Sequence, residues 1–196
     1  SIAVTVLKDT IKREHFDENY TYGFDERGNE IEFIKYTKEG NIKHKEVKKY
    51  DERDSLLYSK KNALTTKNET HIEENFYSYN DKGFLTEKKS YEKDPNTGIT
   101  HKKELYKYNN DQKLIENSYY SNDSLKRRIL YWYDNKGNLL RDSYFDNELN
   151  IDTEYEYNHI GNLIKKTENY INKYMKFVEL YKYDAKNRLI LITRVE

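Results

Sequence analysis

A short pattern of residues recurs along the chain about every 26 residues, and this internal repeat constrains the fold more than any other feature. A typical copy has two aromatic residues separated by one position, followed by Asp or Asn and, three residues later, by Gly. A period of this length is typical of proteins built from stacked supersecondary units. Seven copies align without gaps, at Tyr22–Gly28, Lys48–Asp54, Tyr77–Gly83, Tyr106–Gln112, Tyr131–Gly137, Tyr155–Gly161 and Tyr181–Asn187.

Each copy predicts a β-strand that ends in a tight turn. Side chains two positions apart lie on the same face of a strand, and Tyr is favoured in strands. Asp or Asn at the first position of a turn and Gly at the fourth favour a type I turn, and Gly or Asn also tolerates the left-handed conformation of a bulged hairpin. Gln112 occupies the Gly position of the fourth copy, and we expect its turn to be strained or locally different.

A second strand is predicted after each turn, because apolar and charged residues mostly alternate there. The chain therefore predicts an all-β fold: an antiparallel meander of about seven β-hairpins, or roughly 14 strands. Open sheets rarely exceed ~10 strands without curling or splitting, so we expect one long curved or coiled sheet. Ile31 begins the second strand of the first copy, and Leu begins it in the others, at Leu56, Leu85, Leu114, Leu139, Leu163 and Leu189.

The repeat also predicts the domain organisation. We expect a single β-repeat domain over residues 1–196, in which seven units of about 26 residues occupy residues 20–196. Residues 1–19 lack the aromatic pattern and are expected to form a lead-in or cap. The segment from Leu57 to Glu74 fits the pattern least well, so irregular or capping structure is expected there too.

Composition decides whether such a chain folds. Leu, Ile, Val and Phe make up roughly 22% of it, which is near the limit for disorder. Aromatic residues make up 15%, and 35 Lys and Arg balance 35 Asp and Glu, whereas disordered chains are poor in aromatics and carry net charge. The 21 tyrosines are therefore expected to supply the core, and cross-strand ladders are expected to join the units.

The sequence offers no catalytic, cofactor or metal site. There is no Cys. Calcium takes six to eight oxygen ligands, whereas each turn supplies one or two carboxylates, and neither a phosphate loop nor a nucleophile elbow is present. We therefore expect no enzyme activity and no cofactor. Five histidines are scattered without metal-binding spacing, at His15, His44, His71, His101 and His159.

Charge and hydropathy exclude two further classes of partner. The net charge is zero, so the electrostatic attraction that dominates nucleic-acid binding is missing. The basic runs Lys43–Lys49 and Lys126–Arg128 are better explained as solvated strand faces and edge protection. No apolar run approaches the ~18 residues of a membrane helix, so no membrane span is expected.

The segment Tyr131–Leu139, with Tyr155–Leu163 and Tyr181–Leu189, resembles the tyrosine-aspartate (YD) repeats of bacterial Rhs proteins. The resemblance covers most of residues 20–196. It implies a bacterial origin, a hairpin-repeat sheet, and a periplasmic or cell-surface location rather than a cytoplasmic one. Proteins of that family build long sheets that enclose toxin domains, which seven short units cannot do. Asp94–Gly98 has one residue too many for the family's cleavage motif, so no catalytic residue is carried over.

Two functional hypotheses follow. The first is a non-catalytic interaction protein that presents its repeat surface to a protein partner, either as an immunity or accessory protein of an interbacterial toxin system or as a cell-envelope surface protein. The second is a carbohydrate-binding module that uses exposed rings, because Tyr offers an apolar face and a polar tip. Both hypotheses use the same candidate residues: Tyr79, Tyr108, Tyr131, Trp132, Tyr133, Tyr155, Tyr157, Tyr181 and Tyr183.

Overall fold

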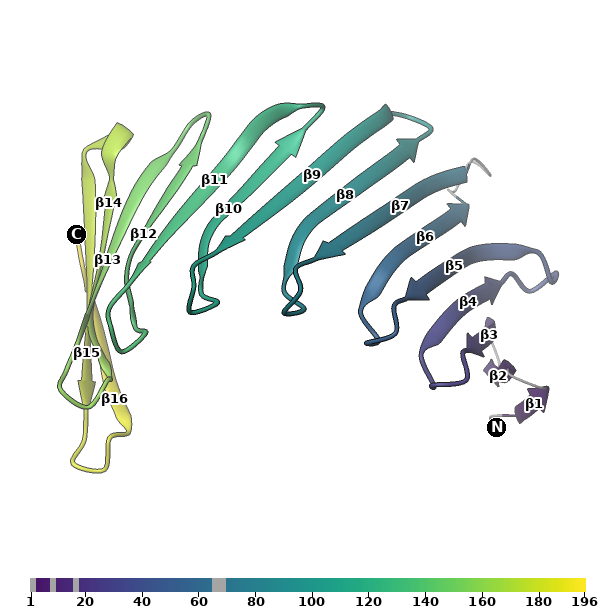
Figure 1. Cartoon of the computed structure of the whole chain (residues 1–196), viewed down its shortest axis with the longest axis horizontal. Helices are drawn as coiled ribbons and strands as arrows, with labels where there is room; N and C mark the ends of the chain where they lie inside the picture. Colours follow the sequence, from purple (N-terminus) through teal and green to yellow (C-terminus); the bar gives the residue numbers. More distant parts are fainter. Residues whose placement is uncertain (1–2, 8–9, 16–17, 65–69) are drawn as a thin grey trace. The chain divides into compact units, whose positions relative to one another are not determined.

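The computed structural model describes residues 3–7, 10–15, 18–64 and 70–196, which form an antiparallel meander of 16 strands. Strand order in the sheet follows the chain from β1 to β16, so the sheet is open, with one neighbour each for β1 and β16 (Figure 1). The predicted all-β meander of hairpins is confirmed. The N-terminal segment, expected to be a lead-in or cap, contributes two strands, whereas residues 1–2, 8–9 and 16–17 lie outside the described residues.

Contacts divide the chain into two compact units. Unit 1 comprises residues 1–104 and 121–123, and unit 2 comprises residues 105–120 and 124–196. Strand β9 contributes residues to both units. The strands up to β9 are β1 (Ala3–Leu7), β2 (Thr10–His15), β3 (Glu18–Phe24), β4 (Glu30–Tyr36), β5 (Ile42–Tyr50), β6 (Leu56–Leu64), β7 (Thr70–Tyr79), β8 (Leu85–Asp94) and β9 (Gly98–Tyr108).

The remaining strands belong mainly to unit 2. A short 3₁₀ helix, η1 (Ile171–Lys173), lies between β14 and β15. The poorly fitting segment Leu57–Glu74 is not irregular where it is described, because it belongs to β6 and β7; residues 65–69 lie outside the description. The later strands are β10 (Leu114–Ser121), β11 (Ser124–Tyr133), β12 (Leu139–Asp146), β13 (Asn150–Tyr157), β14 (Leu163–Tyr170), β15 (Met175–Tyr183) and β16 (Leu189–Val195).

The turn after each aromatic pair has one recurring geometry. In the first, the Asp25 amide donates to the Asn29 carbonyl and the Gly28 amide to the Asp25 carbonyl, at 2.9 and 3.0 Å. The Asp25 carboxylate accepts the amides of Arg27 and Asn29. Gly28 has a φ of 89°, and the strand register shifts beside Phe24. This is the type I turn with a left-handed bulge residue that the Asx and Gly positions predict.

Two turns depart from the sequence pattern but keep its geometry. The Gln112 amide donates to the Asn109 carbonyl at 3.0 Å, so this turn is not locally different. Its φ of 64° is in the left-handed region, so of the two alternatives expected for this turn, strain is the one that the structure shows. An eighth turn, not predicted, joins β4 and β5, with Gly40 at a φ of 86°. There the Thr37 hydroxyl accepts the Asn41 amide at 3.3 Å and replaces the Asx side chain.

Replacing Gln112 with Gly should raise the free energy of unfolding by about 0.5 to 1 kcal/mol. The left-handed conformation costs a residue with a Cβ about 1 to 2 kcal/mol, and the entropy of Gly offsets part of the gain. Urea denaturation would measure the gain as a higher midpoint at an unchanged slope. Gly83→Ala is the matched control: a Cβ there meets no atom within 4 Å, so the backbone alone should make it destabilising. A neutral Gln112→Gly would contradict this account.

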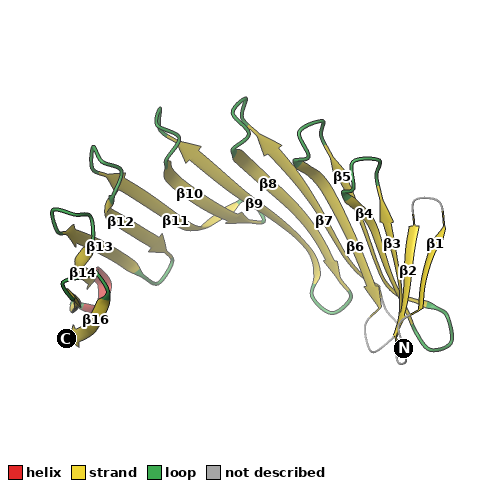
Figure 2. Ribbon diagram, turned by 90° about the horizontal axis from the view of Figure 1, so that it is seen from below, coloured by secondary structure: helices red, strands yellow, loops and turns green. Residues whose placement is uncertain are grey.

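Each unit is a single layer of strands (Figure 2). Among the residues whose burial is described, Ile34 is the only buried apolar one. Every tyrosine but Tyr174 is half-buried, so the expectation that tyrosines form the core is wrong: no second layer covers them. The buried polar residues are small and lie in the middle of the strands, at Ser59, Asn75, Asn117, Ser118, Ser143, Thr153 and Thr167.

Hydrogen bonds across the strands satisfy three of these residues, Ser59, Asn75 and Ser143. Asn75 donates its amide to the Ser59 hydroxyl at 3.3 Å and accepts the Ser90 hydroxyl at 2.6 Å, so one network joins β6, β7 and β8. Ser143 on β12 donates to the Asp152 carboxylate on β13. Buried polar groups cost stability unless they are paired. The middle of the sheet is therefore held by polar ladders rather than by an apolar core.

Candidate interaction surface

The second tyrosine of a repeat ties its unit to the preceding one. Its hydroxyl donates to the main-chain carbonyl of the first residue of the preceding strand, which lies 18 to 23 residues earlier in the chain. A neutral hydrogen bond of this kind contributes about 0.5 to 1.5 kcal/mol. The described pairs are Tyr50 with Glu30 at 3.2 Å and, at 2.9 Å each, Tyr79 with Leu56, Tyr133 with Leu114, Tyr157 with Leu139 and Tyr183 with Leu163.

In two repeats the first tyrosine of the pair bonds a carboxylate instead. Tyr155 donates to Asp142 at 2.8 Å, and Tyr181 donates to Glu179 at 2.7 Å. Burial and the hydrogen bond to Glu179 raise the pKa of Tyr181 to about 12. Burial, together with the hydrogen bond to Asp142, likewise raises the pKa of Tyr155. These hydroxyls are therefore neutral donors at physiological pH, and their donor capacity is used inside the sheet.

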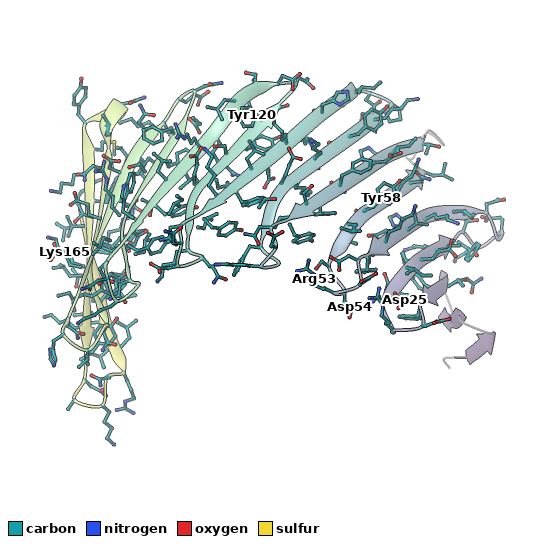
Figure 3. The ribbon with its side chains drawn as sticks, in the orientation of Figure 1. Asp25, Arg53, Asp54, Tyr58, Tyr120 and Lys165 are labelled. Carbon is teal, nitrogen blue, oxygen red and sulfur yellow. The ribbon has the colours of Figure 1, made fainter. Side chains whose placement is uncertain are left out.

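Neighbouring turns also contact one another. In unit 1 the side-chain amide of Asn29 donates to the Asp54 carboxylate at 2.8 Å, and the Arg27 guanidinium pairs with the same carboxylate at 2.9 Å. Arg53 donates to the Asp81 carbonyl of the next turn at 3.0 Å. Asp25, Arg53 and Asp54 are labelled in Figure 3. The turn side chains thus form a polar row along one end of the strands.

Trp132 differs from its tyrosine neighbours because it points to the other face of the sheet. Side chains alternate along β11, and Trp132 pairs with Arg141 on β12. The Arg141 guanidinium carbon lies 5.0 Å from the centre of the indole ring, and Trp132 is 42% exposed. Such a cation–π contact stabilises both side chains without hiding the ring. Of the nine candidate residues, Trp132 alone is exposed.

The strand register shows which residues share the face of Trp132. Arg128 lies opposite Phe145, and Trp132 opposite Arg141, which in turn lies opposite Glu154 on β13. All five are exposed. We call this set, Arg128, Trp132, Arg141, Phe145 and Glu154, the Trp132 face.

Two hollows border this region of unit 2. The larger, of about 500 Å³, lies between two turns and is lined by Asn109, Asp111, Lys113, Ile115 and residues 131–137. The smaller, of about 300 Å³, is lined by residues 125–128, Leu130 and residues 145–147. The Arg127 Nε atom is buried and makes no hydrogen bond within the described chain. The sequence marked Lys126–Arg128 only as a basic run, so the smaller hollow was missed.

Charged groups of this surface are mostly paired. Burial opposes ionisation of Glu116, yet hydrogen bonds from Lys107, Ser118 and Arg128 hold its pKa below the usual range. Asp134 in a turn has a lowered pKa because the Asn138 side chain and nearby amides donate to it. Both carboxylates are therefore ionised and engaged. Within the described residues, no three His, Asp or Glu side chains group as metal ligands, and no helix is long and apolar enough to span a membrane.

The candidate tyrosines of β11 and Trp132 lie on opposite faces of the sheet, and only some of the candidate residues of unit 2 lie close together. Tyr131, Trp132 and Tyr133 meet at the larger hollow. Tyr79 lies in unit 1, and Tyr108, Tyr155, Tyr157, Tyr181 and Tyr183 lie along other strands of unit 2. The sequence missed Arg141 and Phe145. The register of a hairpin could have predicted them, because counting outward from the turn gives the residue that lies opposite each position.

Comparison with known proteins adds a fold similarity. No family model and no curated protein matches the chain. Among solved structures, a chain of the Photorhabdus luminescens Tc holotoxin pore matches with a TM-score of 0.57 and 15% identity; the match covers 92% of this chain and 10% of that one. A porin-like protein from Bacteroides uniformis matches with a TM-score of 0.38 and 11% identity, covering 96% and 84% of the two chains. Over most of its length, this chain therefore shares the fold of a tenth of the Tc holotoxin chain.

Proposed function

We propose that the chain is a non-catalytic binding protein that presents the Trp132 face to a protein partner. The observation that carries the proposal is a single-layer sheet whose Trp, Phe and Arg side chains are exposed on one face: Trp132 is 42% exposed and Phe145 is 36% exposed. Trp and Arg are enriched among the residues that dominate binding energy in protein interfaces. Charged residues at the rim, such as Arg128 and Glu154, would supply specificity.

The tyrosine face supports the proposal less well. Its hydroxyls bond carbonyls and carboxylates within the sheet, so a partner there would have to displace existing bonds. Two versions of the proposal follow from the resemblance to tyrosine-aspartate repeats and from the fold shared with the Tc holotoxin chain: an immunity or accessory protein of an interbacterial toxin system, and a cell-envelope surface protein. Both need the same property, which is specific binding of another protein.

The test is affinity capture from the source organism with the intact chain as bait, followed by titration of the purified partner. Alanine at Trp132 and Arg141 together should weaken binding by about 30-fold or more, because truncating an interface hot spot costs ~2 kcal/mol or more. Tyr174→Ala is the matched control, since Tyr174 is 99% exposed and lies beside η1, away from this face. The proposal fails if no protein binds the intact chain at micromolar affinity, or if both variants bind equally well.

Carbohydrate binding is the second candidate, and one observation favours it. Trp132, which is exposed, is among the residues that line the 500 Å³ hollow, together with the polar residues Asn109, Asp111 and Asp134. An aromatic face beside hydrogen-bonding groups suits a sugar ring. A glycan array should then give hits that Trp132→Ala abolishes. An array without hits would end this alternative.

A further inference from the structure

The smaller hollow of unit 2 combines an apolar surface with basic side chains. It has a volume of about 300 Å³ and is lined by residues 125–128, Leu130 and residues 145–147. Phe145, one of the lining residues, is exposed, so an apolar group meets solvent there. Ligand pockets start at about this size, and most have apolar walls with a few polar groups that fix the ligand. The hollow is therefore large enough for a small organic molecule.

The register of β11 with β12 shows which of the lining side chains share a face of the sheet. The two strands lie side by side in Figure 1, and Arg128 lies opposite Phe145. Side chains two positions apart point to the same face of a strand. Lys126 and Leu130, on either side of Arg128 in β11, therefore lie on the face of Arg128 and Phe145.

The other two charged residues that line the hollow add no net charge to it. Arg127 lies opposite Asp146, and both point to the other face of the sheet. The Asp146 carboxylate accepts the Tyr144 hydroxyl at 2.7 Å, and the Arg127 guanidinium carbon lies 5.8 Å from the centre of the Tyr119 ring. The charge at the hollow is therefore decided by Lys126 and Arg128 and by the groups that contact them.

These groups carry a surplus of positive charge. The Nε and Nη2 atoms of Arg128 bond to the two carboxylate oxygens of Glu116 at 3.1 and 3.2 Å. Lys107 donates to the same carboxylate at 3.0 Å, so two cations share one anion. Within the described residues, the Lys126 ammonium makes no ion pair. Three cations thus accompany one carboxylate, in a chain whose net charge is zero.

We propose that this hollow binds a small organic anion, whose oxyanion group pairs with Lys126 and Arg128 and whose apolar group lies against Leu130 and Phe145. The proposal goes beyond the proposed function, because the ligand is a small molecule and not a protein. Side chains two positions apart on a strand are about 7 Å apart, so the long Lys126 and Arg128 side chains can reach one carboxylate, sulfonate or phosphate group. Arg128 keeps its Nη1 atom for this contact, and such charge-assisted hydrogen bonds are strong.

The test compares two probes that differ only in charge. Anilinonaphthalene sulfonate joins a sulfonate to aromatic rings, and phenylnaphthylamine has the same rings without the sulfonate. Fluorescence titration of the full chain should give a dissociation constant below about 1 mM for the sulfonate. A higher salt concentration should weaken binding of the sulfonate and not of the neutral probe, because the ion pairs are exposed to solvent.

A charge reversal at Lys126 tests the role of the cations. Lys126→Glu should weaken binding of the sulfonate about fivefold or more and leave binding of the neutral probe within about twofold. Lys126 is exposed and unpaired within the described residues, so this variant should fold like the unchanged chain, which circular dichroism checks. Lys186→Glu is the matched control: it reverses the charge of an exposed turn lysine that does not line the hollow.

Heteronuclear NMR locates the site. The bound sulfonate should shift the amide signals of residues 125–128 and 145–147 more than those of residues 134–137, which line the larger hollow. The proposal is overturned if the sulfonate does not bind, if the largest shifts lie elsewhere, or if the two charge reversals bind it equally well. Equal weakening of both probes by Lys126→Glu would also overturn it, because adsorption to an apolar surface would then be enough. Capture of a protein partner is tested at Trp132 and Arg141, which do not line this hollow, so either proposal can fail alone.

Discussion

Replacing Thr153 in the middle of β13 with Pro is expected to lower the free energy of unfolding by about 3 kcal/mol or more. Thr153 is 5% exposed and pairs with Asp142 on one side and Glu168 on the other. Proline removes a ladder hydrogen bond, leaves its partner unsatisfied and does not fit a central strand. No apolar core compensates the loss, because the sheet around Thr153 is a single layer.

The same substitution should change the cooperativity of unfolding. In a linear array each repeat is stabilised by its neighbours, so a broken boundary separates the parts on either side. Urea denaturation followed by circular dichroism and by the fluorescence of Trp132 should give two different midpoints for Thr153→Pro and one midpoint for the unchanged chain. Thr153→Val is the matched control, since it keeps a β-branched side chain. A loss below about 1 kcal/mol in Thr153→Pro would contradict the central place of β13.

Replacing Tyr157 with Ala is expected to cost about 2 to 3 kcal/mol. Removing a buried aromatic ring costs about 3 to 5 kcal/mol, and the Tyr157 ring is half-buried. Tyr157→Phe should cost about 1 kcal/mol, because it loses only the hydrogen bond to the Leu139 carbonyl. The difference between the two variants therefore measures the ring, and the smaller value measures the hydroxyl.

Urea denaturation checks both Tyr157 variants. Tyr174→Ala should fall within about 0.5 kcal/mol of the unchanged chain, since Tyr174 is 99% exposed. If Tyr157→Phe is neutral, the hydroxyl does not tie the units together. If Tyr157→Ala is no worse than Tyr174→Ala, the ladder contributes nothing to stability.

The positions and geometry of the turns are the part of the fold that the sequence predicts best. The Asx side chain and the left-handed fourth residue act within five consecutive residues, so local sequence was enough to predict seven reversals. The sequence pattern did not predict the turn at Thr37, because a hydroxyl replaces the Asx carboxylate or amide there. The low propensity of Gln for a left-handed φ predicts a strained or different turn at Gln112, but pairing of β9 with β10 holds this turn in the common geometry despite the unfavourable φ.

The burial of side chains is the property that the sequence predicts least well. An apolar residue in an alternating strand is normally expected to face a core, whereas here a strand has solvent on both faces. Ser143 is 1% exposed because neighbouring strands and their long side chains surround it, and its size lets them approach. Among the candidate residues, composition marked Tyr and Trp alike. Only the pairing of β11 with β12 shows how Trp132 differs from the tyrosines. Its ring lies against the Arg141 guanidinium, whereas several of the tyrosine hydroxyls already donate hydrogen bonds within the sheet.

By itself, the amino-acid order determined the hairpin unit, its period and the chemistry of its reversals, since each depends on residues close together in the chain. Tertiary structure decided what the tyrosines do, because the carbonyl that Tyr183 reaches belongs to Leu163, 20 residues earlier on another unit. It also decided which residues of neighbouring strands lie opposite each other, such as Trp132 and Arg141. Both depend on how whole hairpins register against each other, and a register is a property of two paired strands rather than of either one alone.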